Sequence, residues 1–205
     1  MSKTIGYIVI PHDSYAQWRL ATNGNGYDAD GMYGCQCYDF VLEFWYSIGF
    51  PQGYPVSGIP GQGNTGNAYD IWTYREYNTD YNGTTYFDLI YSLNDVKQGD
   101  IIIYNQFSGN PYGHVGFADE DYSVWHANNP SSYEFPILSE NNGGFPDPAG
   151  GAYTNIHGYD TRLFLGAFRY KPWHTTPPTP SRPVATTKFP FVLYARKLRN
   201  RQRGL

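Results

Sequence analysis

The sequence has few cysteines and no long apolar run. Its only two cysteines, Cys35 and Cys37, are separated by one residue. A disulfide between them would close a very small, strained ring, and no other cysteine is available, so a disulfide framework is excluded. No stretch reaches the roughly 18 apolar residues of a membrane span, and residues 1–10 lack the charged-then-apolar pattern of a signal peptide. We therefore expect neither a membrane span nor a signal peptide.

Charged residues are also scarce, at 16% of the 205 residues. Together with 23 glycines and 15 prolines, this excludes a coiled coil or helical bundle, which would be rich in Ala, Glu, Lys and Leu. Aromatic residues make up 19% of the chain, with 21 tyrosines, which excludes a disordered chain. The length suits one domain with an extension, and its core needs no disulfides.

The charges are distributed unevenly along the chain. Residues 1–160 hold all 18 acidic residues and 4 basic ones, whereas residues 161–205 hold 10 basic residues and no acid. Nucleic-acid binding by the acidic part is disfavoured, because phosphate contacts need Lys and Arg. Five prolines between residues 172 and 183 indicate a stiff, extended linker. We predict a domain at residues 1–172 and a Pro-rich linker with a basic tail at residues 173–205.

The clearest element is a helix over residues 37–48. Its apolar side chains share one stripe, and Gly49 and Pro51 would end it. Weaker patterns indicate further elements: helices at 15–20 and 68–74, and strands at 101–104, 114–118, 122–126 and 163–170. Helices followed by an antiparallel sheet indicate an α+β domain.

Cys37 is the first candidate for chemistry. It begins the predicted helix, where free backbone N–H groups and the helix dipole favour an anion, so a thiolate forms more easily there. A small buried core residue is the alternative on position alone. We interpret Cys35 as a bystander, and no histidine has the spacing that a zinc site with these cysteines would need.

His114 is the second candidate. It lies between Gly113 and Gly116 on a strand whose other face carries Val115 and Phe117. The glycines leave space around the imidazole, which suits the approach of a substrate. A hydrogen-bonded structural histidine is the alternative for His114 alone, but a cysteine and a histidine together can form a nucleophile and its base.

Three motifs resemble the CHAP domain (cysteine, histidine-dependent amidohydrolase/peptidase), in the family's order and spacing. They are Gly-Cys-Gln-Cys-Tyr-Asp-Phe at 34–40, Gly-Asp-Ile-Ile at 99–102 and Gly-His-Val-Gly-Phe at 113–117. The resemblance covers residues 12–171. It implies a papain-like α+β fold, with N-terminal helices packed on an antiparallel sheet.

The same resemblance implies a function. Family members cleave the peptidoglycan of bacterial cell walls, and many are phage lysins. Cys37 would attack an amide bond and His114 would act as its base. The chain would then be a phage protein acting on the host cell wall, as a free endolysin or as a tail-associated lysin. Amidase and endopeptidase activity both stay open.

The third member of the site is left open by the sequence. The family often carries Glu-x-Asn on the strand after the histidine, and the chain has His126 and Asn128 there. Asn128 could orient the imidazole through a neutral hydrogen bond, as Asn does in Cys-His-Asn proteases. His126 could do so only as the right neutral tautomer. Both could also be ordinary strand and turn residues.

An acidic run before Cys37 has the spacing of a calcium-binding loop. Its members occupy positions 1, 3, 5, 7 and 12 of an EF-hand pattern, with Tyr33 in place of the usual Gly at position 6. Calcium-binding CHAP lysins resemble this run, which implies a structural Ca²⁺ that fixes Cys37. A solvated turn is the alternative. The expected ligands are Asp28, Asp30, Met32, Gly34 and Asp39.

The tail suggests a second class of function. A virion structural or tail protein could keep the fold mainly for docking, with residues 173–205 as its anchor. Within these residues, an apolar run at 189–194 adjoins a basic stretch, which favours a phage structural protein as the partner over wall polymer or nucleic acid. A binding module with a catalytically inactive site is disfavoured, because Cys37 and His114 are both present.

Overall fold

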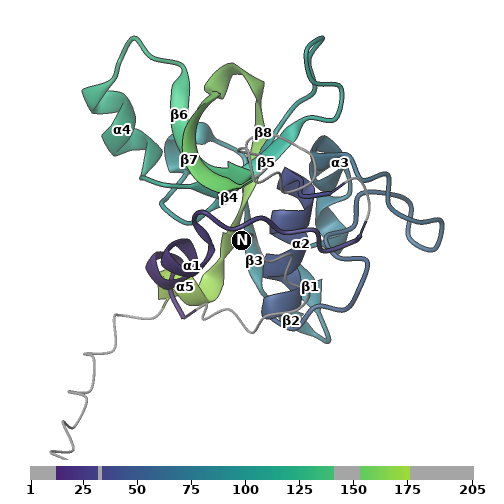
Figure 1. Cartoon of the computed structure of the whole chain (residues 1–205). Helices are drawn as coiled ribbons and strands as arrows, with labels where there is room; N and C mark the ends of the chain where they lie inside the picture. Colours follow the sequence, from purple (N-terminus) through teal and green to yellow (C-terminus); the bar gives the residue numbers. More distant parts are fainter. Residues whose placement is uncertain (1–12, 32–33, 141–152, 176–205) are drawn as a thin grey trace, which may run out of the picture. The chain divides into compact units, whose positions relative to one another are not determined.

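A six-stranded antiparallel sheet forms the centre of the fold (Figure 1). The computed structural model describes residues 13–31, 34–140 and 153–175. The strands lie in the order β3-β8-β4-β5-β6-β7, and a separate hairpin pairs β1 with β2. Their bounds are β1 Asp80–Tyr81, β2 Thr84–Thr85, β3 Phe87–Ile90, β4 Ile101–Tyr104, β5 His114–Ala118, β6 Glu134–Glu140, β7 Thr154–Asp160 and β8 Phe164–Tyr170.

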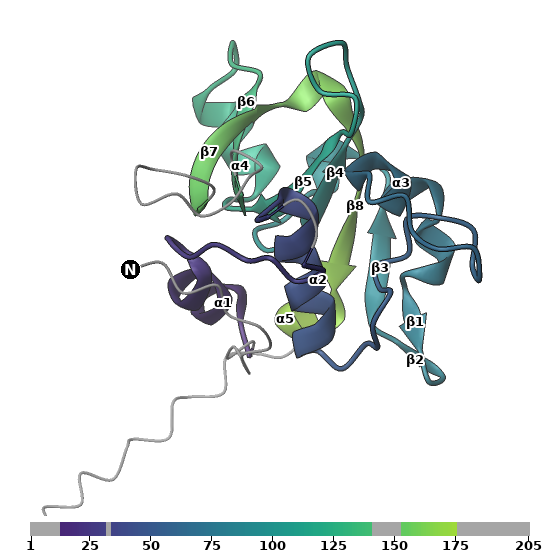
Figure 2. The ribbon, with the colours of Figure 1, turned by 45° about the vertical axis from the view of Figure 1, so that its right-hand side comes forward.

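The helices divide between the two faces of this sheet. On one face α2 supplies Phe40 and Phe44 to a large core with Phe117; on the other face α4 supplies Trp125 to a smaller core with Phe135. Figure 2 shows α2 in front of the sheet, with α1 to its left. The helix bounds are α1 Tyr15–Thr22, α2 Cys37–Ser47, α3 Ala68–Thr73, η1 Arg75–Tyr77, η2 Leu93–Asp95, α4 Tyr122–Asn128, η3 Thr161–Leu163 and α5 Lys171–Thr175.

Helix α2 is buried deeply, and this fixes its first residue relative to the sheet. Phe40, Phe44 and Trp45 are fully buried. Phe44 contacts Phe117 of β5 edge to face, with ring centroids 5.2 Å apart, and Trp45 stacks on Phe87 of β3 at 4.7 Å. Aromatic pairs of this kind add to the free energy gained by burying the rings. The start of α2 is therefore held rigidly against β5.

The structure confirms the α+β class and the elements that carry the candidate site. Helix α2 begins at Cys37 as predicted and ends at Ser47, and Gly49 has the left-handed φ of 96° that suits the residue after a helix end. Strands β4 and β5 have the predicted bounds. Strand β8 begins one residue after the predicted start.

The predicted strand at residues 122–126 is wrong, because these residues begin helix α4. Tyr122 and Trp125, three residues apart, lie on the same side of the helix and pack against Phe135, each with ring centroids 5.3 Å apart. Val124, which completes the apparent alternation with Tyr122, is 55% exposed. The buried side chains of this segment are therefore spaced three residues apart, as in a helix, and the apparent two-residue alternation did not reflect burial.

Helix α5 follows β8 and packs on the main core. Trp173 contacts Phe44 at a centroid distance of 4.9 Å and Tyr170 at 5.4 Å. The predicted domain boundary at 172/173 falls inside this helix and stays a prediction. Most of the predicted linker and tail, residues 176–205, lies outside the described residues.

None of the helices in the described part of the chain has the length and apolar character needed to cross a membrane.

Candidate active site and metal loop

Cys37 is the first residue of α2, and its thiol lies against the start of β5. Gln36 before it is extended, with a φ of −134°. The thiol receives hydrogen bonds from the backbone of Val115 and of Tyr38. Val115 directly follows His114, so the structure brings the two predicted catalytic residues to the same end of β5.

The thiol of Cys37 is not activated by its position at the helix start. Burial raises its pKa to about 12, and the nearby carboxyl groups of Glu140 and Asp39 add to the increase. The two backbone hydrogen bonds lower the pKa but do not offset burial. The expected ease of thiolate formation is therefore not found, and the resting group is a neutral thiol.

His114 is held by a hydroxyl group on the neighbouring strand. Its Nε2 lies 3.1 Å from Oγ of Ser139 in β6. The same hydroxyl donates its one proton to the backbone oxygen of Val115, at 2.7 Å. Ser139 must then accept the proton of His114 Nε2–H, because a hydroxyl has a single proton to donate. This tautomer leaves Nδ1 unprotonated, which is the form a general base needs.

Two further side chains of β7 surround the imidazole. Tyr159 stacks on it, with ring centroids 4.4 Å apart and an angle of 15° between the planes, and His157 lies at 5.6 Å. His114 is only 6% exposed. Burial, followed by the proximity of His157, lowers the pKa of His114 to about 3, so the resting imidazole is neutral.

Gly113 is required for this placement of His114. Its φ is 70°, in the left-handed region, and a Cβ there would lie 2.6 Å from the backbone oxygen of Tyr104 and 2.9 Å from Cβ of Tyr69. Any side chain at this position would push the start of β5 away from β4. The glycine beside the histidine is therefore explained by close packing against Tyr69 and Tyr104 and by its φ.

Because His114 is buried in its neutral form, the free energy of unfolding should fall as the pH is lowered. The folded-state pKa is about 3 and the unfolded value about 6.5, so below pH 6.5 the unfolded chain binds a proton that the folded chain does not. This contribution is constant above pH 6.5 and falls by about 1.4 kcal/mol per pH unit below it, or about 2 kcal/mol at pH 5.

To test this, the free energy of unfolding of wild type and of His114→Gln is measured by urea unfolding at pH 7.5 and at pH 5. Wild type should lose about 2 kcal/mol more than the variant on acidification. The other titrating groups are common to both chains, so their contributions largely cancel. Equal losses would show that His114 is not buried in its neutral form.

The structure does not bring Asn128 or His126 to the imidazole of His114. Asn128 ends α4, is exposed, and donates its side-chain N–H to the backbone oxygen of Val124 at 2.9 Å. His126 stacks on Tyr122 of the same helix, at 5.5 Å. Because residues 122–128 form a helix, the strand that follows β5 along the chain is β6. The prediction that Asn128 orients His114 is corrected to Ser139.

Ser139 was missed because β6 was not predicted, although the sequence carried a signal for it. Glu140-Asn141-Asn142 is a literal Glu-x-Asn run, and Ser139 directly precedes it. Asn141 itself lies outside the described residues. The signal becomes visible once β6 is known to pair with β5 through Phe117 and Leu138.

The loop before α2 and the first turn of α2 together hold three of the predicted metal ligands. Carboxylate oxygens of Asp28, Asp30 and Asp39 lie within 4.8 Å of one another. Asp39 is buried and accepts backbone N–H bonds from Ala29, Asp30 and Gln36 at 3.1–3.2 Å. Gly34 is described and buried, whereas Met32 lies outside the described residues.

The electrostatics of this loop suit a cation. Burial, together with the charges of Asp30 and Asp28, raises the pKa of Asp39 to about 8. Oδ1 of Asp28 is buried and has no hydrogen-bond partner among the residues that the structure describes, which is costly for a carboxylate without a compensating ligand. Clustered carboxylate oxygens are the ligands that Ca²⁺ prefers. The residues present therefore fit a hard cation.

Glu140 links the acidic loop to the candidate catalytic residues. It follows Ser139 on β6 and is 1% exposed. Its Oε1 accepts the backbone N–H of Tyr27 at 2.7 Å, directly before Asp28. Burial, with Asp39 and Asp28 nearby, raises its pKa to about 9, so it is a neutral acid at pH 7. The start of the acidic loop is thus tied to β6, the strand whose Ser139 contacts His114.

A thiol at the start of a helix that packs on β5, and an imidazole at the start of β5 in an antiparallel sheet, define a class of α+β proteins with a candidate cysteine nucleophile. The sequence profile of the CHAP domain family matches residues 22–128, just over half of the chain. The chain therefore belongs to the CHAP domain family.

The chain is similar to a phage endopeptidase in sequence and to a solved endolysin structure in fold. A D-alanyl-L-alanine endopeptidase of Streptococcus phage B30 is 31% identical over 159 residues, which are 77% of this chain and 30% of that protein. The chain thus spans less than a third of that relative's length. The crystal structure of the endolysin LysIME-EF1 is similar in fold, with a TM-score of 0.50 and 22% identity over 78% of this chain and 64% of that one.

Proposed function

We propose that this chain is a peptidoglycan hydrolase that cleaves an amide bond of the bacterial cell wall through Cys37. The observation that carries the proposal is the thiol of Cys37 bound to the backbone of Val115, next to a His114 whose tautomer is set by Ser139. Family membership supports it. The name of the phage relative supports a peptide bond as the target.

The reaction begins with two neutral groups. As the substrate carbonyl approaches, Nδ1 of His114 takes the thiol proton, and the sulfur of Cys37 bonds to the carbonyl carbon. The backbone N–H groups at the start of α2 face the negative charge that develops on the carbonyl oxygen. The C–N bond breaks, His114 returns its proton to the leaving amine, and water then hydrolyses the thioester to a carboxylate.

Ser139 acts through His114 as a positioning residue. Ser139→Ala removes the acceptor of Nε2–H, so the ring can rotate or change tautomer. We expect a loss of about 10- to 100-fold in kcat with little change in KM, as for small displacements of a catalytic group. Steady-state kinetics on soluble wall fragments would measure both constants.

A matched control is Ser47→Ala at the other end of α2, whose hydroxyl also donates to a backbone oxygen. This variant should retain wild-type kinetics. Equal kcat for Ser139→Ala and wild type would remove Ser139 from the site.

We propose Ca²⁺ as a structural ion of the loop before α2. Asp28, Asp30 and Asp39 would hold it, with backbone oxygens of Met32 and Gly34 as further ligands. When bound, the ion would neutralise the clustered carboxylates and stiffen the chain that leads into Cys37. For residues 173–205, a phage structural protein as partner stays a prediction.

The proposed function is tested on purified cell walls. Incubation with the protein should release new amino groups, detected by amine labelling, without new reducing sugar ends. New reducing ends in place of amino groups would indicate cleavage of a glycosidic bond and would overturn the proposal.

A further inference from the structure

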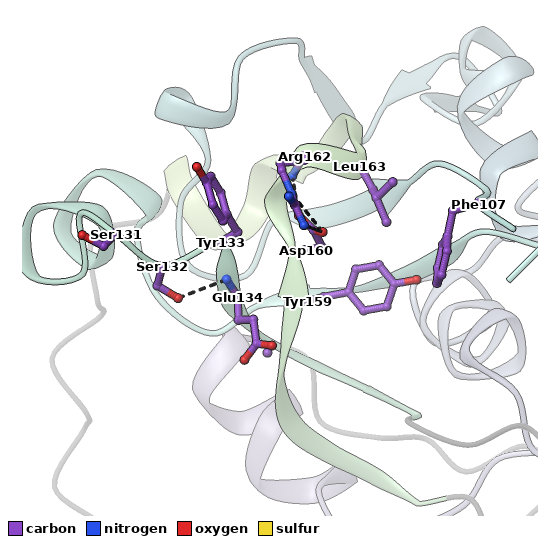
Figure 3. A pocket seen from close by; sticks show the side chains of 10 residues that line it. Phe107, Ser131, Ser132, Tyr133, Glu134, Tyr159, Asp160, Arg162 and Leu163 are labelled. Carbon is purple, nitrogen blue, oxygen red and sulfur yellow. Dashed lines mark hydrogen bonds and ion pairs between the residues drawn. The ribbon is translucent and has the colours of Figure 1, made fainter. Parts of the chain in front are cut away.

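A groove of about 680 Å³ lies where β6 begins and β7 ends, and it is lined by Tyr159, the residue that stacks on His114. The segment before β6, the η3 turn and Phe107 form its sides, as Figure 3 shows. A volume of this size is typical of sites for small molecules and short peptides.

Tyr159 connects the groove to the reacting groups. It lines the groove, and its ring stacks on His114 at 4.4 Å. Its ring points toward Phe107 across the groove in Figure 3. The thiol of Cys37 is among the groups that raise the pKa of this tyrosine, after burial. Tyr159 is therefore shared between the lining of the groove and the surroundings of His114.

The charges that line the groove leave one carboxylate uncompensated. Asp160 and Arg162 neutralise each other through several N–H···O bonds, including Nε to both carboxylate oxygens at 2.9 and 3.1 Å. Within the described part of the chain, no side-chain ion pair or hydrogen bond is found for the carboxylate of Glu134. Its Oε2 lies over Gly158, where a Cβ would be 3.3 Å away. The groove thus offers a single net negative charge.

One face of the Tyr133 ring is covered within the groove, whereas Phe107 is 46% exposed. The guanidinium of Arg162 covers a face of Tyr133, with Cζ 4.7 Å from the ring centroid. Hydroxyl groups of Ser131 and Ser132 lie nearby. A polar, negatively charged groove with a covered aromatic face suits a peptide that carries a positive charge better than a neutral saccharide.

We propose that this groove is a subsite for the peptide part of the substrate, in which Glu134 pairs with a free primary ammonium group of that peptide. The proposal rests on the proposed function, since it takes the wall peptide as the substrate. Glu134 would strengthen binding without taking part in bond cleavage.

The test compares purified walls whose amino groups are intact with walls acetylated by acetic anhydride. For wild type, acetylation should raise KM about 2- to 5-fold with kcat unchanged, the size expected for an exposed ion pair. Glu134→Gln should show this higher KM on both substrates, and Glu134→Lys should raise KM further on intact walls. Glu120→Gln, an exposed carboxylate outside the groove, should behave as wild type.

The source of the ammonium group is tested with a soluble lysine tetrapeptide and its Nε-acetyl form. The unmodified peptide should inhibit wild type more strongly, and Glu134→Gln should not distinguish the two. Equal inhibition of wild type, with walls still sensitive to acetylation, would point to an amino sugar and overturn the peptide assignment. If wild type cleaves intact and acetylated walls with the same KM, the proposed subsite is overturned. No cleavage of either preparation would instead overturn the proposed function on which the subsite rests.

Discussion

Replacing Cys37 with alanine is expected to reduce the rate of wall cleavage by at least about a thousand-fold, the usual cost of removing a nucleophile. The fold should survive, because Cys37 occupies a half-buried position where alanine fits the start of a helix. The rate of amine release measures the effect, and thermal unfolding checks the fold.

Cys35 provides the matched control. It is fully buried, and burial raises the pKa of its thiol to about 12. Cys35→Ala should therefore lower stability by a small amount and leave the cleavage rate within a few-fold of wild type. An inactive, folded Cys35→Ala beside a fully active Cys37→Ala would reverse the assignment of the nucleophile.

Calcium is expected to raise the thermal midpoint of wild type by roughly 5–10 °C at a concentration 100 times its Kd. Such a concentration contributes about 2.7 kcal/mol, and each kcal/mol shifts the midpoint of a domain of this size by about 2–4 °C. Magnesium should have a smaller effect, because it gives up its water ligands reluctantly. Scanning calorimetry with chelator, calcium or magnesium measures the three midpoints.

The double variant Asp28→Asn/Asp30→Asn should differ from wild type in opposite directions with chelator and with calcium. In chelator it should be at least as stable as wild type, because it removes repulsion among carboxylates within 4.8 Å of one another. In calcium it should be less stable than wild type and show no shift. A wild-type midpoint that does not respond to millimolar calcium would exclude the ion.

The part of the fold that holds Cys37 and His114 could be predicted because its signals are local. The apolar stripe of α2 and the compact apolar strands β4 and β5 each lie within a few consecutive residues. These signals do not depend on knowing which segments pair. The glycine before His114 was interpreted as leaving space for a substrate, whereas the structure requires it for close packing and for its positive φ.

Strands β6 and β7 could not be predicted in the same way. Pro136 lies within β6 and argues against a strand, yet it pairs with Gly158 of β7. Strand β7 is mostly polar and has no apolar alternation. Strand β6 pairs with both β5 and β7, and β7 pairs with β6. A local sequence pattern does not contain this information.

The same reason explains the error at the third site residue. Asn128 was aligned with the family pattern because residues 122–126 were interpreted as the next strand, whereas they form α4. Ser139 lies 25 residues after His114 and meets it only through the sheet. The lowered acidity of the Cys37 thiol likewise depends on burial by distant segments.

The most direct test of Cys37-dependent amide hydrolysis is mass analysis of wall fragments released in ¹⁸O-labelled water. The expected result is one ¹⁸O in the new carboxyl group of each cut amide, with wild type and Cys35→Ala but not with Cys37→Ala. Incorporation of ¹⁸O at a sugar carbon, or labelled carboxyl groups formed at the wild-type rate by Cys37→Ala, would contradict it.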